Sequence, residues 1–185
     1  MKMNNKAHHG ATYPFRNGEH ILIDTNIWLY LHPPATKPAS SWEVTRYSNV
    51  FARLLRAKAQ PVVDALILSE YLNSYIRIEY AAWKSTYPKF KDFRNSADAV
   101  AILRSAVAEV GQILNTAVPH DTALTNIDLP AVLGAVQSAV LDFNDGLLIE
   151  NCRKHGWKLL TNDADMQLGG IDLITHNKRL LTACP

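Results

Sequence analysis

Acidic residues of this sequence stand where a folded chain can bring carboxylates together. Asp24 follows the apolar run 20–23 in "HILIDTN", and Asp163 closes "WKLLTND". A carboxylate at the end of a buried strand costs free energy unless a partner compensates its charge. Two further acids, Glu70 and Asp145, lie in segments with helical spacing. The four carboxylates predict a site for Mg²⁺ or Mn²⁺, because these hard cations prefer oxygen ligands.

Carboxylates that meet in one cleft raise one another's pKa, because like charges close together oppose ionisation. Divalent cations relieve this repulsion, and two such ions about 3.5–4 Å apart form the usual arrangement for cleaving phosphodiesters. One ion orients and deprotonates a water molecule, and together the ions neutralise charge on the phosphate. The acid pattern therefore predicts a metal-dependent hydrolase of phosphate esters.

The elements that must position these acids follow from the apolar patterns and from the proline and glycine residues. Strands are expected at residues 20–23, 61–63, 157–163 and 171–175. Helices are expected at residues 25–31, 42–59, 65–83, 97–118, 130–140 and 144–156. Strand and helix alternate at both ends of the chain, which predicts an α/β fold with a central parallel sheet flanked by helices. Because ligands of such sheets bind outside the carboxyl ends of the strands, Asp24 and Asp163 are expected at one edge. A right-handed crossover returns Asp145 to the same edge.

Length and composition predict a single globular domain without a membrane span. The chain has 185 residues, of which 48% are hydrophobic, and its net charge of +2 does not by itself indicate a polyanion partner. Residues 1–18 are polar and are expected to form a flexible segment ahead of a domain at 19–185. Pro33, Pro34 and Pro38 predict a loop. Two cysteines, the lack of an apolar stretch near the start and the absence of an 18-residue apolar run favour a cytoplasmic protein.

The quoted motifs, taken in order, resemble a known family. "ILIDTN", "LILSEYLN" and "NDGLLIENCRKHGWKLLTNDADM" are similar to the motifs of PIN-domain nucleases, which include the VapC-type toxins of toxin–antitoxin systems. The similarity covers about residues 20–83 and 140–176. The resemblance implies a single PIN-like domain whose catalytic and metal-binding acids are Asp24, Glu70, Asp145 and Asp163. It adds Asp165 as a further metal ligand.

The same resemblance implies an endoribonuclease that uses Mg²⁺ or Mn²⁺ to cleave RNA. An antitoxin protein and a second copy of the chain are the candidate partners. Asn26 and Thr161 are expected to orient ligands or the attacking water, and Arg77, two turns beyond Glu70, is expected to contact a phosphate. Residues from about 84 to 140 exceed a minimal connection, so an extended helical insertion is expected there.

Several alternatives stay open at this stage. Asp142 lies three residues before Asp145 and is the fallback for the third ligand; Asp145 is preferred because "DGLLIENC" matches the helix of the family. Asp24 and Asp145 can also be read as helix caps. The alternative function is a non-catalytic PIN-like module that binds RNA or protein. No G-x-x-x-x-G-K-[ST] or G-x-G-x-x-G motif exists, so a nucleotide-binding protein of those classes is disfavoured.

Two segments of the insertion also have two interpretations. "WKSTYPKFKDFR" at 83–94 can stack bases on its aromatics and contact phosphates through its basic residues, or it can pack the aromatics inward with the lysines in water. The second interpretation is favoured. An apolar stripe is expected to pack inside the molecule, with a dimer or antitoxin surface as the alternative, and it consists of Val100, Leu103, Val107, Val110 and Leu114.

Overall fold

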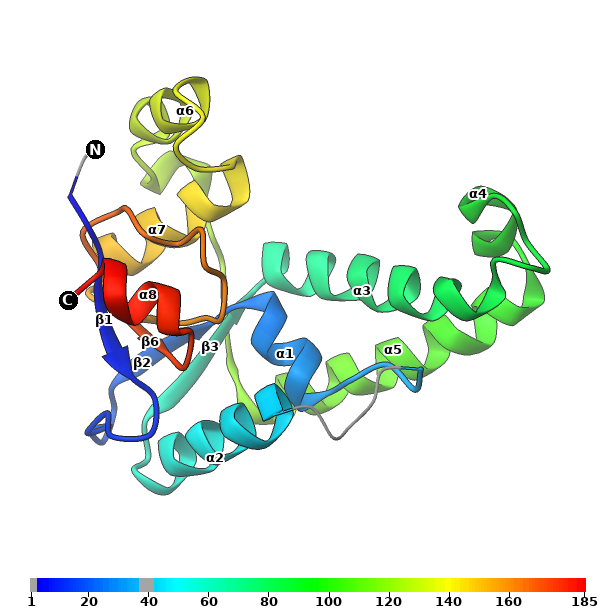
Figure 1. Cartoon of the computed structure of the whole chain (residues 1–185), viewed down its shortest axis with the longest axis horizontal. Helices are drawn as coiled ribbons and strands as arrows, with labels where there is room; N and C mark the ends of the chain where they lie inside the picture. The colour runs from blue at the N-terminus through cyan, green and yellow to red at the C-terminus, as the bar shows by residue number, and fades with distance from the viewer. Residues whose placement is uncertain (1–2, 37–41) are drawn as a thin grey trace.

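Parallel strands form the sheet at the centre of the molecule (Figure 1). The computed structural model describes residues 3–36 and 42–185. Among these residues the sheet has six strands, in the order β1-β6-β5-β2-β3-β4. The strands are β1 (Lys6–His9), β2 (His20–Ile23), β3 (Gln60–Asp64), β4 (Val118–His120), β5 (Lys158–Leu160) and β6 (Asp172–Thr175). The predicted α/β class with a central parallel sheet is confirmed.

Helices cover both faces of this sheet, with α2 below the strands and α7 above them in Figure 1. The helices are α1 (Thr25–Leu31), α2 (Trp42–Arg56), α3 (Ala65–Tyr80), α4 (Phe90–Arg94), α5 (Ala97–Thr116), α6 (Leu129–Gln137), α7 (Phe143–His155) and α8 (Lys178–Ala183). Short 3₁₀ turns lie at Ala81–Trp83 and Leu124–Asn126. No described helix has both the length and the apolar character needed to cross a membrane.

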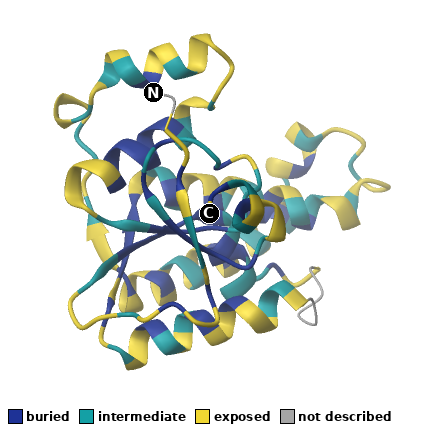
Figure 2. Cartoon of the chain, turned by 60° about the vertical axis from the view of Figure 1, so that its left-hand side comes forward, coloured by how far each residue is buried: buried dark blue, intermediate teal, exposed yellow. Residues whose placement is uncertain are grey.

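The central strands are apolar because both of their faces are covered. Ile21, Leu22 and Ile23 of β2 are completely buried, as are Leu159 and Leu160 of β5. Figure 2 shows this buried layer running through the middle of the molecule. Continuous apolar runs are typical of parallel strands that are packed between helices. The core therefore fixes the strands from which the acidic residues emerge.

The helices α3 and α5 project together from the sheet as an arm, with α4 at its tip (Figure 1). A second small core fills the tip, where Ile76, Phe93 and Ala99 are buried. The aromatic rings packed around them belong to Tyr80, Trp83, Tyr87 and Phe90. The aromatics of residues 83–94 thus pack inward, as favoured from the sequence. Lys84, Lys89 and Lys91 are exposed.

The predicted apolar stripe on α5 packs inward only in part, because Leu103 and Val110 pack against the two cores while the other three residues do not. Val100, Val107 and Leu114 are exposed by 47%, 60% and 42%. The buried positions on α5 are Ala99, Ala106 and Ile113. The helix thus packs along the line of Ala99, Ala106 and Ile113, and the residue that follows each of them turns toward solvent.

Two edge strands were not expected from the sequence. Residues 1–18 were expected to be flexible, yet Lys6–His9 forms β1 in parallel register with β6, and His8 Nε2 lies 3.0 Å from Asp172 Oδ1. The helical insertion expected at 84–140 contains β4, whose Pro119 is tolerated because the strand lies at the sheet edge. Short polar edge strands lack the apolar alternation that reveals a strand in a sequence. The expectations at residues 1–2 and at Pro38 lie outside the described residues.

Candidate active site

The register of β2 and β5 places Asp24 beside Thr161. Ile23 pairs with Leu160, so the next residue of each strand emerges at the same edge of the sheet. Thr161 Oγ1 donates a hydrogen bond to Asp24 Oδ2 at 2.6 Å. The backbone N–H of Asp163 donates to the same threonine oxygen at 3.0 Å. Thr161 therefore links the two acids that the strands deliver.

Asp24 is buried and does not serve as a side-chain cap for the helix that follows it. Its side chain is 6% exposed and makes no capping hydrogen bond to α1. Asn26 Nδ2 donates to Asp24 Oδ2, and Asn26 Oδ1 accepts from the backbone N–H of Asn162 at 3.1 Å. Asn26 and Thr161, both predicted to orient groups in the site, thus hold one oxygen of Asp24 in place.

Asp64, at the end of β3, is an acid with a structural role in the same sheet and provides a comparison for Asp24. Its Oδ1 accepts from the backbone N–H of Ile67 at 2.9 Å and caps α3. Its Oδ2 accepts from Thr122 Oγ1 at 2.9 Å and from Asn151 Nδ2 at 3.5 Å. Both oxygens of Asp64 therefore accept hydrogen bonds that stabilise its negative charge. Asp24, by contrast, has the negative charges of Glu70 and Asp163 near it.

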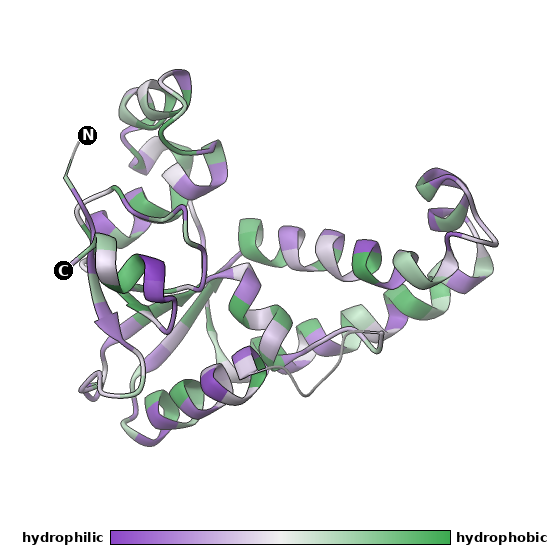
Figure 3. Cartoon of the chain, viewed as in Figure 1, coloured by the Kyte–Doolittle hydropathy of each residue, from purple (hydrophilic) through white to green (hydrophobic). Residues whose placement is uncertain are grey.

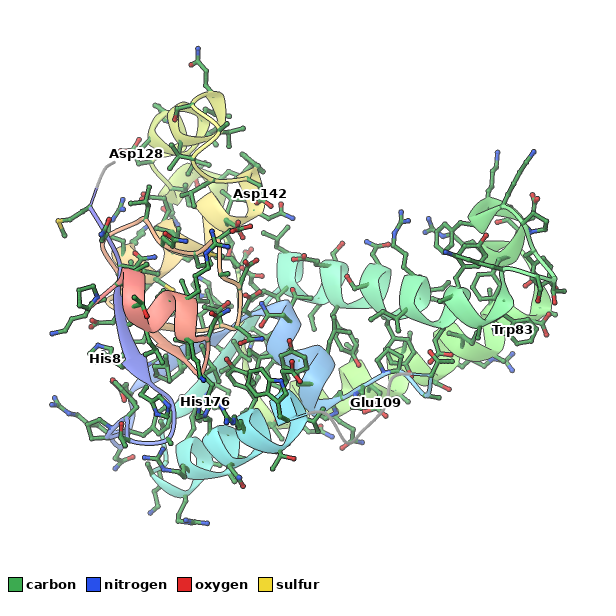
Figure 4. The ribbon with its side chains drawn as sticks, in the orientation of Figure 1. His8, Trp83, Glu109, Asp128, Asp142 and His176 are labelled. Atoms are coloured by element: carbon green, nitrogen blue, oxygen red, sulfur yellow. The ribbon has the colours of Figure 1, made fainter. Side chains whose placement is uncertain are left out.

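Glu70 and Asp145 come to this site from helices on different sides of the sheet. Glu70 lies on α3, and its Oε2 accepts a hydrogen bond from Thr25 Oγ1 at 3.1 Å. Asp145 lies in the first turn of α7, which ends at Gly156 in a left-handed conformation as its sequence predicts. The cap of α7 is Asp142, whose Oδ1 accepts from the Asp145 backbone N–H at 2.8 Å (Figure 4). The Asp145 carboxylate is not used as that cap.

Electrostatic coupling joins these four acids. Burial, followed by the charges of Glu70 and Asp163, raises the pKa of Asp24 to about 6. Burial, followed by the charges of Asp142, Asp163, Asp24 and Glu70, raises the pKa of Asp145 to about 7. The pKa of Asp24 thus responds to Glu70 and Asp163, and the pKa of Asp145 responds to all three other acids. Asp24, Glu70, Asp145 and Asp163 are called the acid cluster below.

The acid cluster fits a divalent cation by its chemistry. All its members offer carboxylate oxygens, which are the donors that Mg²⁺ and Mn²⁺ prefer. A cation would relieve the mutual repulsion that raises the pKa of Asp24 and Asp145. In residues 3–36 and 42–185 no three Asp, Glu, His or Cys side chains lie close enough together to hold one ion as they stand. Metal ligation by Asp24, Glu70, Asp145, Asp163 and Asp165 therefore stays a prediction.

Two other predicted site residues lie at the margins. Asp165 is exposed, and its backbone N–H donates to Asp163 Oδ1 at 2.9 Å. It lines a hollow of about 720 Å³ together with Asp142 and Asp145. Arg77 is exposed on the arm, where its guanidinium carbon lies 4.7 Å from the centre of the Phe90 ring. The structure thus places Arg77 on the arm and brings Asp165 to the site.

Two residues of the site were missed in the sequence. Thr25 binds Glu70, and Asn162 holds Asn26 through its backbone and accepts a hydrogen bond from Tyr47 Oη at 2.8 Å. Each stands next to a predicted acid, Thr25 after Asp24 and Asn162 before Asp163. That adjacency was the available signal, but the partners of both side chains come from distant segments.

Substitutions of Asp142 and Asp145 are expected to have opposite effects on stability, because only Asp142 caps α7. Replacing Asp142 with Ala removes the cap of α7 and is expected to lower the free energy of unfolding by about 1 kcal/mol. Asp145→Asn is expected to raise the stability of the metal-free protein at pH 8, because it removes a carboxylate whose pKa is raised. Urea unfolding in EDTA measures both changes. Asp142→Asn is the matched control, because Asn can still cap the helix. If Asp142→Asn lowered the free energy of unfolding as much as Asp142→Ala does, the assignment of Asp142 as the cap of α7 would be contradicted.

Comparison with known proteins identifies the family of the chain. The PIN domain family model matches residues 21–171. The VapBC2 complex from Rickettsia felis, solved with a DNA fragment from their promoter, contains a chain that is 14% identical, with a TM-score of 0.54 over 84% of this chain and 98% of that chain. PAE2754 from Pyrobaculum aerophilum is 18% identical, with a TM-score of 0.45 over 89% of this chain and 88% of that chain. No curated protein matches. The family match covers most of the sequence and includes the whole acid cluster, so the chain belongs to the PIN domain family.

Proposed function

We propose that the chain is a metal-dependent endoribonuclease that hydrolyses RNA phosphodiester bonds at the acid cluster. The observation that carries the proposal is the arrangement at the strand ends, where Thr161 contacts both Asp24 and Asp163 and the adjacent Thr25 contacts Glu70. The raised pKa values of Asp24 and Asp145 agree with it, because strongly shifted carboxylates are frequent at functional sites. Membership of the PIN domain family, whose members are generally nucleases, supports the same conclusion.

The cluster has the parts that this reaction needs. Mg²⁺ or Mn²⁺ would be held by Asp24, Glu70, Asp145 and Asp163, with Asp165 at the margin. When bound, the metal supplies positive charge for the scissile phosphate and favours deprotonation of the attacking water. Thr161 and Asn26 both donate to Asp24 Oδ2, which fixes the direction of that carboxylate. Thr25 does the same for Glu70.

A protein partner is part of the proposal. The VapBC2 structure is a complex, which supports an antitoxin as one candidate for this chain. The exposed apolar residues on α5, Val100, Val107 and Leu114, support a surface for an antitoxin or a second copy. Figure 3 shows how hydrophobic and hydrophilic segments are distributed over the arm and the sheet. Larger exposed apolar patches mark interaction sites more often than isolated residues do.

Cleavage of RNA by the purified chain tests the proposed function. Wild-type protein with Mg²⁺ is expected to cut an internally labelled, unstructured RNA at internal positions. Asp163→Asn keeps the shape of the side chain and its acceptor for the Asp165 N–H, but removes a charge, so cleavage is expected to slow about 100-fold. Circular dichroism checks that the variant is folded. Intact RNA with the wild-type protein would favour a non-catalytic PIN-like module.

A further inference from the structure

A basic groove lies between α2 and α8, beside the acid cluster. Its main hollow has a volume of about 470 Å³. The residues that line this hollow are Trp42, Arg46, Asn162, His176, Asn177, Lys178 and Arg179. A second hollow of about 370 Å³ adjoins it, because Arg46 and His176 line both. Figure 4 shows His176 between the two helices.

Hydrogen bonds fix the walls of this groove. Tyr47 Oη donates to Asn162 Oδ1 at 2.8 Å and accepts from the His176 backbone N–H at 3.0 Å. Asn177 Nδ2 donates to the Asn162 carbonyl at 2.7 Å. Asn162 also borders the acid cluster, where its N–H binds Asn26. Asn162 therefore links the groove to the candidate active site.

The charge of the groove is positive and is not neutralised by the protein. Arg46, Lys178 and Arg179 are exposed, and no acidic residue lines the main hollow. Among the described residues, none of these three side chains forms an ion pair. The buried His176, 6% exposed, also has a ring Nδ1 with no hydrogen-bond partner in the described part of the chain. Cationic side chains thus line this hollow beside a buried histidine.

Trp42 adds an aromatic surface at the rim of the groove. Its side chain is 49% exposed, and the guanidinium carbon of Arg46 lies 4.8 Å from the centre of its ring. Exposed aromatic rings next to basic side chains are typical of sites for single-stranded nucleic acid, because bases stack on the rings while the cations contact phosphates. The aromatics of the arm, by contrast, are packed in its own small core.

We propose that this groove binds the RNA strand on one side of the scissile bond, with phosphates at Arg46, Lys178 and Arg179 and a base on Trp42. This assignment rests on the proposed RNA substrate and gives the strand a path away from the acid cluster. Asn162 connects the two sites, so a strand with its scissile phosphate at the cluster continues directly into the groove. The acid cluster repels a polyanion, and the groove supplies the attraction that holds the strand there.

The proposal is tested by measuring the binding of a fluorescent single-stranded RNA by anisotropy in EDTA. The measurement distinguishes binding at this groove from non-specific attraction to positive charge elsewhere on the protein. The triple variant Arg46→Gln/Lys178→Gln/Arg179→Gln is expected to bind at least about 10-fold more weakly, with a salt dependence reduced by about 2 in log–log slope. The matched control is Lys84→Gln/Lys89→Gln/Lys91→Gln on the arm, which removes the same charge elsewhere. Trp42→Ala is expected to weaken binding about 10-fold, and Trp42→Phe to retain most of it.

The outcomes distinguish the groove from the nuclease activity. Equal losses in both triple variants, or none in the groove variant, overturn the assignment of the groove even if the wild-type protein cleaves RNA with Mg²⁺. Loss confined to the groove variants supports it, even if cleavage is absent and the proposed activity fails. In a competition experiment, a nucleoside monophosphate is compared with unlabelled RNA at the same concentration of nucleotides. If the monophosphate displaces the labelled RNA as well as the unlabelled RNA does, the groove is a pocket for a small phosphate and the strand proposal is overturned.

Discussion

Asp24→Asn is expected to abolish RNA cleavage and at the same time to make the metal-free protein more stable. Asn has nearly the same shape, and its side-chain oxygen can still accept hydrogen bonds from Thr161 and Asn26. The substitution removes the negative charge and replaces the other carboxylate oxygen with an amide NH₂ group. Because a cation at the acid cluster needs that charge, cleavage is expected to fall by at least about 1,000-fold.

The gain in stability has a definite dependence on pH. The folded-state pKa of Asp24 is raised from 3.8 to about 6, so the folded protein holds its proton more tightly than the unfolded chain does. The stability associated with this proton is fully present below pH 3.8 and is lost as the pH rises through 6. Asp24→Asn avoids this loss. Its advantage over wild type is therefore expected to be on the order of 3 kcal/mol at pH 8 and to shrink as the pH falls toward 4.

Urea unfolding in EDTA across this pH range measures the effect, and Asp64 provides the control. Asp64 is also buried at a strand end, but its oxygens accept from Ile67, Thr122 and Asn151. In Asp64→Asn the new amide faces the Asn151 amide donor, so stability is expected to fall by about 1 kcal/mol. If Asp24→Asn destabilises the protein at pH 8 as Asp64→Asn does, Asp24 is a structural acid.

The contrast between these acids explains how far the sequence could predict the site. Asp24 and Asp163 follow apolar runs that are long enough to identify as strands, and parallel strands end at a common edge. That logic needs no knowledge of individual contacts. It cannot distinguish Asp142 from Asp145, because both stand at the start of one helix and only the backbone geometry shows that Asp142 is the cap.

The parts of the fold that were mispredicted share a physical cause. The strand at Lys6–His9 has polar residues and gains its order from pairing with β6, which is distant in sequence. On α5, Val100, Val107 and Leu114 face solvent, because Ala99, Ala106 and Ile113 form the buried face of the helix. In both places a tertiary contact overrides the local pattern. The groove between α2 and α8 was equally hidden, since Arg46 and Lys178 come from opposite ends of the chain.

Removal of divalent metal is expected to eliminate RNA cleavage by the wild-type protein completely. The acid cluster contains only carboxylates, and without a cation it repels the phosphate that must enter it. Addition of Mg²⁺ or Mn²⁺ after EDTA is expected to restore cleavage. The same ions are expected to raise the melting temperature of wild type but not that of Asp24→Asn, because binding to the folded state alone stabilises it. Equal cleavage in EDTA and in Mg²⁺ would refute the metal mechanism.

The pH dependence of this requirement follows from the same carboxylates. Protons compete with the cation for Asp24 and Asp145, whose pKa values are about 6 and about 7 without metal. Cleavage at a fixed, subsaturating Mg²⁺ concentration is therefore expected to decline as the pH falls from 8 to 5.5. Raising the Mg²⁺ concentration is expected to move the midpoint of this decline to lower pH, because bound cation favours the ionised carboxylates. A midpoint that does not move with Mg²⁺ would assign the titration to a group outside the cluster. The pKa values of Asp24 and Asp145 are therefore expected to govern the metal affinity, the cleavage rate and the stability of the metal-free protein together.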